Sequence, residues 1–173
     1  MSSQYAFSSE RSLARYGRKL LVQRANSHGQ VVHVATEVKA IGCIPDMVFY
    51  IKEKRSVSYV VSIEFKLRNW RKALEQAFTQ KNFCNEAYVV LDNNSASSAI
   101  ANIAEFERAN IGLAALDKDQ GLVIYSYCKP SLPFSEQYSA LFSRNLLKRK
   151  TIPQNLIYTR TIRCGNRLSF LRE

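Results

Sequence analysis

Residues 44–67, IPDMVFYIKEKRSVSYVVSIEFKL, contain two strongly apolar segments that are joined by the polar turn KEKRS. The apolar, β-branched and aromatic residues of each segment predict a β-strand. Because only a short turn separates the two strands, they are expected to pair as an antiparallel hairpin. Charged side chains interrupt both strands: Asp46 in the first, and Glu64 and Lys66 in the second. Burying a charge is costly unless it is paired or binds a metal ion, so these three residues need a physical explanation.

Alternation along the second strand places Glu64 and Lys66 on the same face, opposite a row of large apolar side chains. With the turn near residues 52–56, the hairpin brings Asp46 close to Glu64. Two carboxylates that converge at the end of a sheet repel each other, and a divalent cation would neutralise them. Oxygen ligands favour Mg²⁺ or Mn²⁺ over Zn²⁺. We therefore predict a metal site at Asp46 and Glu64, with Lys66 as a point charge near a scissile phosphate or an attacking water.

The residues on either side of the hairpin predict an α/β order. Strands are expected at about 31–39, 44–51, 57–67, 86–92, 111–117 and 122–127, and helices at about 9–23, after an Asn69 cap, and at 95–107. The segment 86–92, EAYVVLD, is a continuous apolar run, which is typical of a strand buried on both faces. The order α-β-β-β-α-β-α-β-β predicts a central mixed β-sheet flanked by helices.

The composition changes after Pro130 and Pro133, which divides the chain into a core, residues 1–130, and a basic C-terminal extension, residues 131–173. The extension is expected to form a helix at 135–148 and a hairpin around the Gly-Asn turn within 156–171. It either packs on the core or contacts a ligand.

The chain has 25 Lys and Arg against 14 Asp and Glu, a net charge of +11, and this excess predicts a polyanionic partner. Residues 144–173 carry eight basic side chains and one acid, Glu173. We predict that this segment binds the phosphate backbone of a nucleic acid. The candidate contacts are Arg144, Lys148, Arg149, Lys150, Arg160, Arg163 and Arg167.

The stretch from about residue 9 to residue 92 resembles the PD-(D/E)XK, or restriction endonuclease-like, nuclease superfamily. The matching motifs are PD at 45–46 and EFK at 64–66, together with the hairpin between them, the helix that follows and the next buried strand. The resemblance implies a restriction endonuclease-like core with a four-stranded mixed sheet. It also implies a metal ion held by Asp46, Glu64 and the carbonyl of Phe65, with Lys66 orienting or activating the attacking water.

This resemblance implies a Mg²⁺- or Mn²⁺-dependent endonuclease that hydrolyses phosphodiester bonds, with double-stranded DNA as the expected partner. A homodimer or a larger complex is compatible with the small size of the chain. The alternative function is a nucleic-acid-binding subunit of a repair, defence or transposition complex that has no turnover of its own. An intact set of Asp46, Glu64 and Lys66 argues against that alternative, because a binding protein has no reason to keep two acids near a polyanion.

Auxiliary site residues follow from the same resemblance. Several members carry a Gln-x-x-x-Tyr pattern on the helix after the EXK motif. Gln76 matches the glutamine and is predicted to assist the site, whereas Gln80 stands where the tyrosine would be and is interpreted as solvent-facing. An additional acid is expected on the first strand or the first helix. Glu37 is favoured over Glu10, because a favourable interaction with the helix dipole is enough to explain Glu10.

Other classes of protein are disfavoured by the composition. The four cysteines, Cys43, Cys84, Cys128 and Cys164, are scattered without a CxxC pattern, so free thiols in a reducing cytoplasm are expected rather than a zinc site. No apolar run reaches the roughly 18 residues that a membrane span requires. The first residues, MSSQYAFSSERS, lack the apolar region of a secretory signal.

Overall fold

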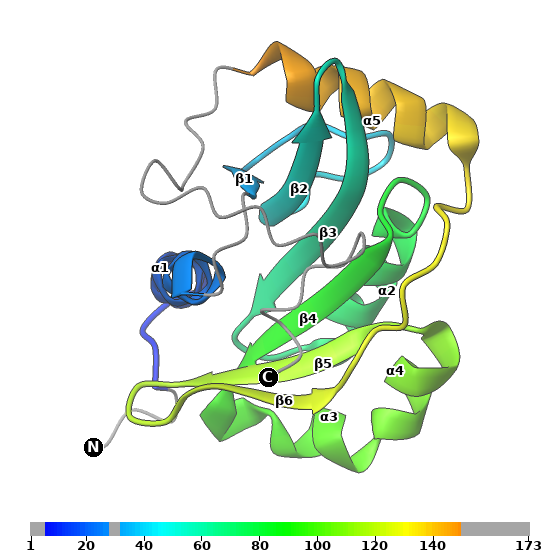
Figure 1. Ribbon diagram of the computed structural model, residues 1–173. Coiled ribbons are helices and arrows are strands. Elements are labelled where there is room, and N and C mark those ends of the chain that lie inside the picture. The colour runs from blue at the N-terminus through cyan, green and yellow to red at the C-terminus, as the bar shows by residue number, and fades with distance from the viewer. Residues whose placement is uncertain (1–5, 28–31, 150–173) are drawn as a thin grey trace.

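The computed structural model describes residues 6–27 and 32–149 as an α/β fold (Figure 1). Within these residues, one six-stranded mixed sheet has the strand order β1-β2-β3-β4-β5-β6. The strands are β1 (His33–Ala35), β2 (Met47–Glu53), β3 (Ser56–Lys66), β4 (Glu86–Asp92), β5 (Gly112–Asp117) and β6 (Gly121–Ser126). The helices are α1 (Glu10–Ser27), α2 (Trp70–Gln80), the 3-10 turn η1 (Asn93–Ser95), α3 (Ser97–Ala101), α4 (Ile103–Ala109) and α5 (Glu136–Lys148). The predicted class, an α/β fold with a central mixed sheet flanked by helices, is confirmed.

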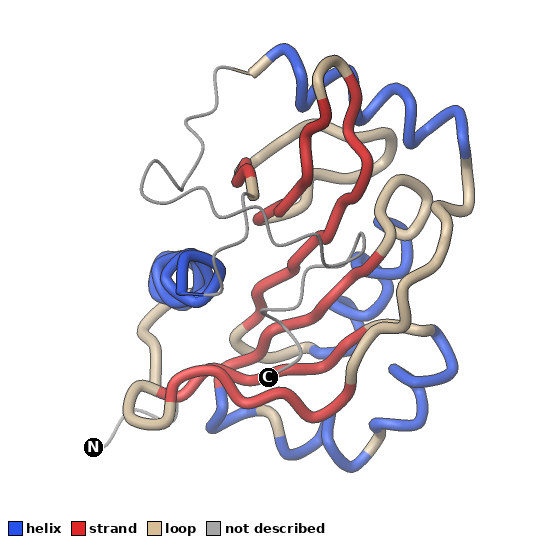
Figure 2. Tube along the Cα trace, viewed as in Figure 1, coloured by secondary structure: helices blue, strands red, loops and turns tan. Residues whose placement is uncertain are grey.

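The pairing of the strands follows the lengths of their connections. β2 and β3 form the predicted antiparallel hairpin, and β1 and β6 also pair antiparallel with their neighbours. β3, β4 and β5 are parallel, because a helical crossover separates each from the next. Every residue of β4 is buried, as the continuous apolar run predicted. The centre of the sheet is therefore β3 and β4, with helices on both sides (Figure 2).

Alternate side chains of β3 enter two separate cores. Val61, Ile63 and Phe65 pack on the face covered by α1. Val60 packs on the opposite face with residues of α2, α3, α4 and α5. Glu64 has the same parity as Val60 and so lies on the α2 side. The two charged residues of β3 thus project from a strand that is otherwise surrounded by core.

A glycine allows α1 to lie directly against β3. A Cβ atom added to Gly17 would lie 2.4 Å from the Phe65 ring and 2.8 Å from a methyl group of Leu116. Those distances are far below van der Waals contact, so a larger residue would push the helix away from the sheet. Glycine inside a helix costs roughly 1 kcal/mol relative to alanine, and here the close packing on Phe65 offsets that cost. The position of α1 over β3 matters because both elements supply residues to the site described below.

Several element boundaries differ from those predicted, and the strand expected at 44–51 begins only at Met47, so that Asp46 precedes β2. The strand expected at 31–39 is reduced to β1, because Glu37 has a φ of 54° and leaves the extended conformation. The helix expected at 95–107 is divided at Asn102, whose side-chain amide donates to the Ser98 carbonyl at 2.8 Å. Such local bonds compete with the regular ladder of a helix. The first helix continues beyond residue 23 to Ser27.

The segment after β6 is anchored on the core and leads into α5. Lys81 is fully buried, and its Nζ donates to the Asn85 carbonyl and to Ser131 Oγ, both at 2.8 Å. Phe142 and Leu146 of α5 are buried in the core on the α2 face. The helix expected at 135–148 is therefore present and packed on the sheet, whereas the hairpin expected at 156–171 lies outside the described residues. None of the helices in the described ranges is long and apolar enough to cross a bilayer.

Candidate active site

The hairpin of β2 and β3 opens at the point where the two sequence motifs meet. Its last paired residues are Met47 and Ile63, and β3 then continues to Lys66 with β4 as its partner. The carboxylate of Asp46 accepts a hydrogen bond from the Phe65 N–H at 2.9 Å. Asp46 therefore takes the place of a strand partner at the end of the ladder and is held beside the EFK motif.

Glu64 is almost completely buried, with 2% of its surface exposed, yet it carries a carboxyl group. Gln80 donates from Nε2 to Glu64 Oε2 at 2.9 Å, and Lys66 Nζ lies 3.5 Å from Glu64 Oε1. Burial is the main cause that raises the pKa of Glu64 to about 7, and the nearby charge of Asp46 adds to it. The structure thus brings Asp46, Glu64 and Lys66 together, as the hairpin predicted, with a carboxyl group that titrates near neutral pH.

The pKa of Asp46 is raised, like that of Glu64. Burial raises the pKa of Asp46 above its usual value, although the Phe65 N–H and the charge of Lys66 oppose the effect. Two adjacent carboxyl groups with raised pKa values show that negative charge is not fully compensated by the surrounding protein groups. A cation bound between them would compensate it.

Lys66 connects this pair to α1. Its Nζ lies 3.5 Å from Glu10 Oε2 as well as 3.5 Å from Glu64 Oε1. Burial acts to lower the pKa of Lys66, but the charges of Glu64, Glu10 and Asp46 outweigh it and the pKa is raised. Lys66 is therefore a protonated hydrogen-bond donor at neutral pH in this state, rather than a base.

The donor set can be tested against the predicted metal. In the described part of the chain, no group of three or more His, Cys, Asp or Glu side chains is arranged to hold a metal ion. The site contains two neighbouring carboxylates instead, those of Asp46 and Glu64. The Phe65 carbonyl belongs to the residue next to Glu64 in β3. Mg²⁺ commonly binds through one or two carboxylates and keeps several water ligands, so a set of this size and chemistry fits Mg²⁺ or Mn²⁺. It does not fit a structural zinc site, which needs four protein ligands.

The glutamine that contacts Glu64 is Gln80, although the sequence pattern favours Gln76. Gln80 is fully buried and contacts Glu64, so its interpretation as solvent-facing was wrong. Gln76 is partly buried one turn earlier, and its Oε1 is buried without a hydrogen-bond partner among the described residues. The sequence signal was present in the stripe that Gln76 and Gln80 share, but the register of α2 on β3 decides which of them reaches Glu64.

The two acids considered as additional site residues, Glu10 and Glu37, both lie near Asp46 but make different contacts. Glu10 contacts Lys66, whereas Glu37 lines a pocket together with Asp46. The left-handed backbone of Glu37 is held from α5, where the Arg149 guanidinium donates to the carbonyls of Thr36 at 2.7 Å and Glu37 at 2.9 Å. Sequence reasoning did not find this contact, because it joins residues more than a hundred positions apart.

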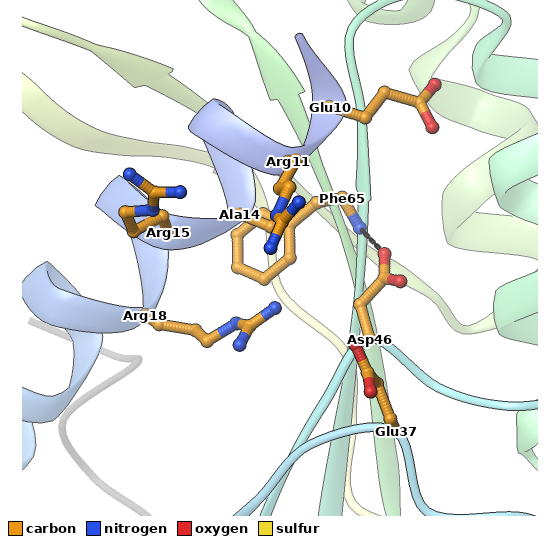
Figure 3. A pocket seen from close by; sticks show the side chains of 8 residues that line it. All are labelled: Glu10, Arg11, Ala14, Arg15, Arg18, Glu37, Asp46 and Phe65. Carbon is orange, nitrogen blue, oxygen red and sulfur yellow. Dashed lines mark hydrogen bonds between the residues drawn. The ribbon is translucent and has the colours of Figure 1, made fainter.

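The pocket beside Asp46 has a volume of about 390 Å³ and lies between α1 and the end of the hairpin (Figure 3). Its lining residues are Glu10, Arg11, Ala14, Arg15, Arg18, Glu37, Asp46 and Phe65. Arg11 and Arg18 extend from α1 into the space beside Asp46. None of these arginines was singled out from the sequence.

The predicted phosphate contacts are only partly within the described residues. Arg144 and Lys148 are exposed on α5, and Arg149 is exposed but also serves the contact with the Glu37 loop. Lys150, Arg160, Arg163 and Arg167 lie outside the described residues. Cys43, Cys84 and Cys128 form no disulfide bond within the described residues, and Cys164 lies outside them.

Comparison of the chain with protein-family models, with curated proteins and with solved structures found no match.

Proposed function

We propose that this protein is a divalent-metal-dependent nuclease of the restriction endonuclease-like class, which hydrolyses phosphodiester bonds in DNA. One observation carries the proposal. A buried glutamate with a pKa near 7, Glu64, meets a second carboxylate, Asp46, and a protonated lysine, Lys66, at the open end of a hairpin beside a pocket. A purely structural arrangement has no reason to crowd two acids in this way, since neutral or apolar residues would avoid the cost of burial.

The arrangement of strands and helices supports the finer fold assignment. β1, β2 and β3 are antiparallel, β4 follows parallel to β3, and α1 and α2 lie on opposite faces of these strands. The pairing of these four strands of the six-stranded sheet agrees with the mixed arrangement that the motif resemblance implies for residues 9–92, and this agreement supports the proposal. The PD and EFK motifs then lie at the ends of adjacent strands, where their side chains can act together.

The chain's own residues would divide the work of hydrolysis. Asp46 and Glu64, with the Phe65 carbonyl, would hold Mg²⁺ or Mn²⁺. Such a cation neutralises phosphate charge and acidifies bound water. The Phe65 N–H fixes Asp46, and Gln80 fixes Glu64, so both carboxylates are oriented before substrate arrives. Lys66, held as a cation by Glu10 and Glu64, would donate to a phosphate oxygen or orient the attacking water.

The proposal is tested by incubating the full chain with supercoiled, linear, branched and single-stranded DNA in Mg²⁺, Mn²⁺ or EDTA. We expect metal-dependent cleavage that is lost in EDTA. Asp46→Asn should be inactive and still bind DNA, because the amide oxygen can still accept from the Phe65 N–H. If the wild-type protein binds DNA but cleaves none of these substrates under any condition, the chain is a nucleic-acid-binding subunit instead.

A further inference from the structure

One wall of the pocket is formed by basic side chains of α1. Arg11, Arg15 and Arg18 occupy positions i, i+4 and i+7 of the helix, so they share one face. All three line the pocket, with Asp46 and Glu37 on its other side. Figure 3 shows Arg11 and Arg18 reaching from α1 into this space. We name these three residues the α1 arginine stripe.

The stripe is not neutralised by the acids around it. The ion pairs found near the site within the described ranges join Lys66 to Glu10 and to Glu64, and none involves an arginine of the stripe. The Nε of Arg18 is buried and has no hydrogen-bond partner in that part of the chain. Because Arg18 also lines the pocket and no ion pair or hydrogen bond among the described residues holds its guanidinium group, that group can donate to a ligand with acceptor atoms.

The position of the stripe relative to the carboxylates identifies the kind of ligand. Arg18 and Asp46 line the same pocket, and the Arg18 side chain points from α1 toward Asp46 (Figure 3). The pocket therefore has a cationic wall and an anionic wall. A phosphodiester fits both, because its oxygens can face the guanidinium groups, while a cation held by the carboxylates would neutralise phosphate charge.

The spacing of the stripe matches a polymer better than a single phosphate. Seven residues of α-helix separate Arg11 from Arg18, which corresponds to roughly 10 Å along the helix axis. Phosphates of one DNA strand advance by about 3.4 Å per nucleotide along the duplex axis and also wind around it, so successive phosphates are farther apart than this rise and the stripe spans about two to three of them. A solvated helix face would explain the exposed Arg11 and Arg15, but it would not explain the buried nitrogen of Arg18.

We infer that the α1 arginine stripe binds consecutive phosphates of the nucleic-acid strand that enters the pocket beside Asp46. The choice of nucleic acid as ligand rests on the proposed function, whereas the inference concerns binding and does not require hydrolysis. It places a phosphate-binding surface on α1, separate from the basic residues of the C-terminal extension. The bound strand would then run along α1, with Arg18 contacting a phosphate beside Asp46.

The test is a titration of a fluorescent 20-base-pair duplex with the full chain in EDTA, repeated over a series of salt concentrations. Each phosphate contact contributes about −0.9 to the slope of log K against log salt. The variant R11Q/R15Q/R18Q should therefore flatten the slope by about 2 to 3 units. A charge-matched control, K54Q/R55Q/R108Q, removes three exposed cations that lie outside this pocket. The control should keep a slope close to that of the wild type.

The variant R11K/R15K/R18K separates charge from folding. It keeps the positive charge, so it should restore most of the salt dependence, and thermal melting of all variants should confirm that they fold. The inference is overturned if the glutamine variant melts normally and keeps the wild-type slope, or if the control flattens it equally. It is also overturned if the wild-type chain does not bind the duplex at low salt.

Cleavage assays on the same proteins keep this inference distinct from the proposed function. Flattening of the slope by R11Q/R15Q/R18Q, in a chain that never cleaves DNA, supports the stripe and rejects the nuclease. Metal-dependent cleavage by a chain whose slope is unchanged in R11Q/R15Q/R18Q supports the nuclease and rejects the stripe.

Discussion

Two buried glutamates on neighbouring strands, Glu64 of β3 and Glu86 of β4, have opposite surroundings. Glu86 is fully buried, and its two oxygens accept hydrogen bonds from the hydroxyl groups of Tyr59 and Tyr88. Glu64 lies against a second carboxylate, Asp46, and its nearest cation is 3.5 Å away. Glu86 thus has a neutral hydrogen-bond donor on each oxygen, as expected for a structural carboxylate. Glu64 also has a donor for each oxygen, Gln80 at 2.9 Å and Lys66 at 3.5 Å. Burial and the charge of Asp46 nevertheless outweigh these donors and raise the pKa of Glu64 to about 7.

The comparison separates burial from function. Burial alone would make both glutamates candidates for a functional site, since acidic side chains are rarely buried completely. What distinguishes Glu64 is its position at the open end of the hairpin, beside Asp46, which lines a pocket that reaches solvent. A buried acid that stands beside another acid and an opening is a candidate for catalysis, whereas one enclosed by hydroxyl donors stabilises the fold.

The largest expected difference between the two glutamates is in DNA cleavage. Glu64→Gln keeps the size of the side chain and an acceptor for Gln80, but it removes the charge that would hold the cation. We expect the rate of cleavage to fall on the order of a thousandfold. Glu86→Gln should cleave at close to the wild-type rate once its folded fraction is measured and corrected for. Equal losses in the two variants would contradict the assignment of the site to Glu64.

In the absence of metal, Glu64→Gln should stabilise the folded protein, whereas Glu86→Gln should destabilise it. The pKa of Glu64 is raised from 4.5 to about 7 in the folded protein, so folding favours its protonated form. The resulting penalty is absent below pH 4.5, grows as pH rises to about 7, and is constant above that. At pH 8 it amounts to about 3 kcal/mol, and Glu64→Gln removes it. Glu86→Gln should instead lose about 2 kcal/mol, because a buried tyrosine hydroxyl loses its acceptor oxygen.

Urea unfolding in EDTA at several pH values measures both effects. The free energy of unfolding of the wild type should fall between pH 4.5 and 7 relative to that of Glu64→Gln. A difference between these two proteins that does not vary with pH would show that Glu64 has an ordinary pKa, and the argument from crowding would then fail.

Much of the fold and the centre of the site could be predicted from local sequence patterns. The two-residue period of β3 placed Glu64 and Lys66 on one side, and the short turn brought Asp46 to them. The contact between Lys66 and Glu10 could not be derived in this way, because it depends on how α1 crosses the sheet, and Gly17 controls that approach. Periodicity identifies the face of a helix but not its neighbour in space.

The misassigned glutamine has a similar cause. Gln76 and Gln80 are on one stripe of α2, and the sequence contains no signal for how far along β3 that stripe begins. The left-handed Glu37 and its contact with Arg149 were also hidden, since α5 and the residue after it reach the Glu37 loop through contacts between residues more than a hundred positions apart.

A smaller effect, on affinity for Mn²⁺, should distinguish Gln80 from Gln76, the two glutamines of α2. Gln80→Leu removes the donor to Glu64 Oε2, and with it the unpaired Oε1 of the same amide. We expect affinity for Mn²⁺ to fall by about tenfold, because supporting hydrogen bonds orient a metal ligand and favour its ionised form. Gln76→Leu is the matched control, and it should bind Mn²⁺ like the wild type. A loss confined to Gln76→Leu would restore the original prediction from the motif.

Calorimetric titration of Mg²⁺ or Mn²⁺ at pH 7 tests the central claim most directly, because it asks whether the crowded carboxylates hold a cation. The wild type and Glu86→Gln should bind, and binding should release about half a proton from Glu64, whose pKa is about 7. The measured heat should therefore depend on the ionisation enthalpy of the buffer. Asp46→Asn and Glu64→Gln should show no binding in the same range. Equal binding by all four proteins, or no binding by the wild type, would contradict a metal site at the end of β3.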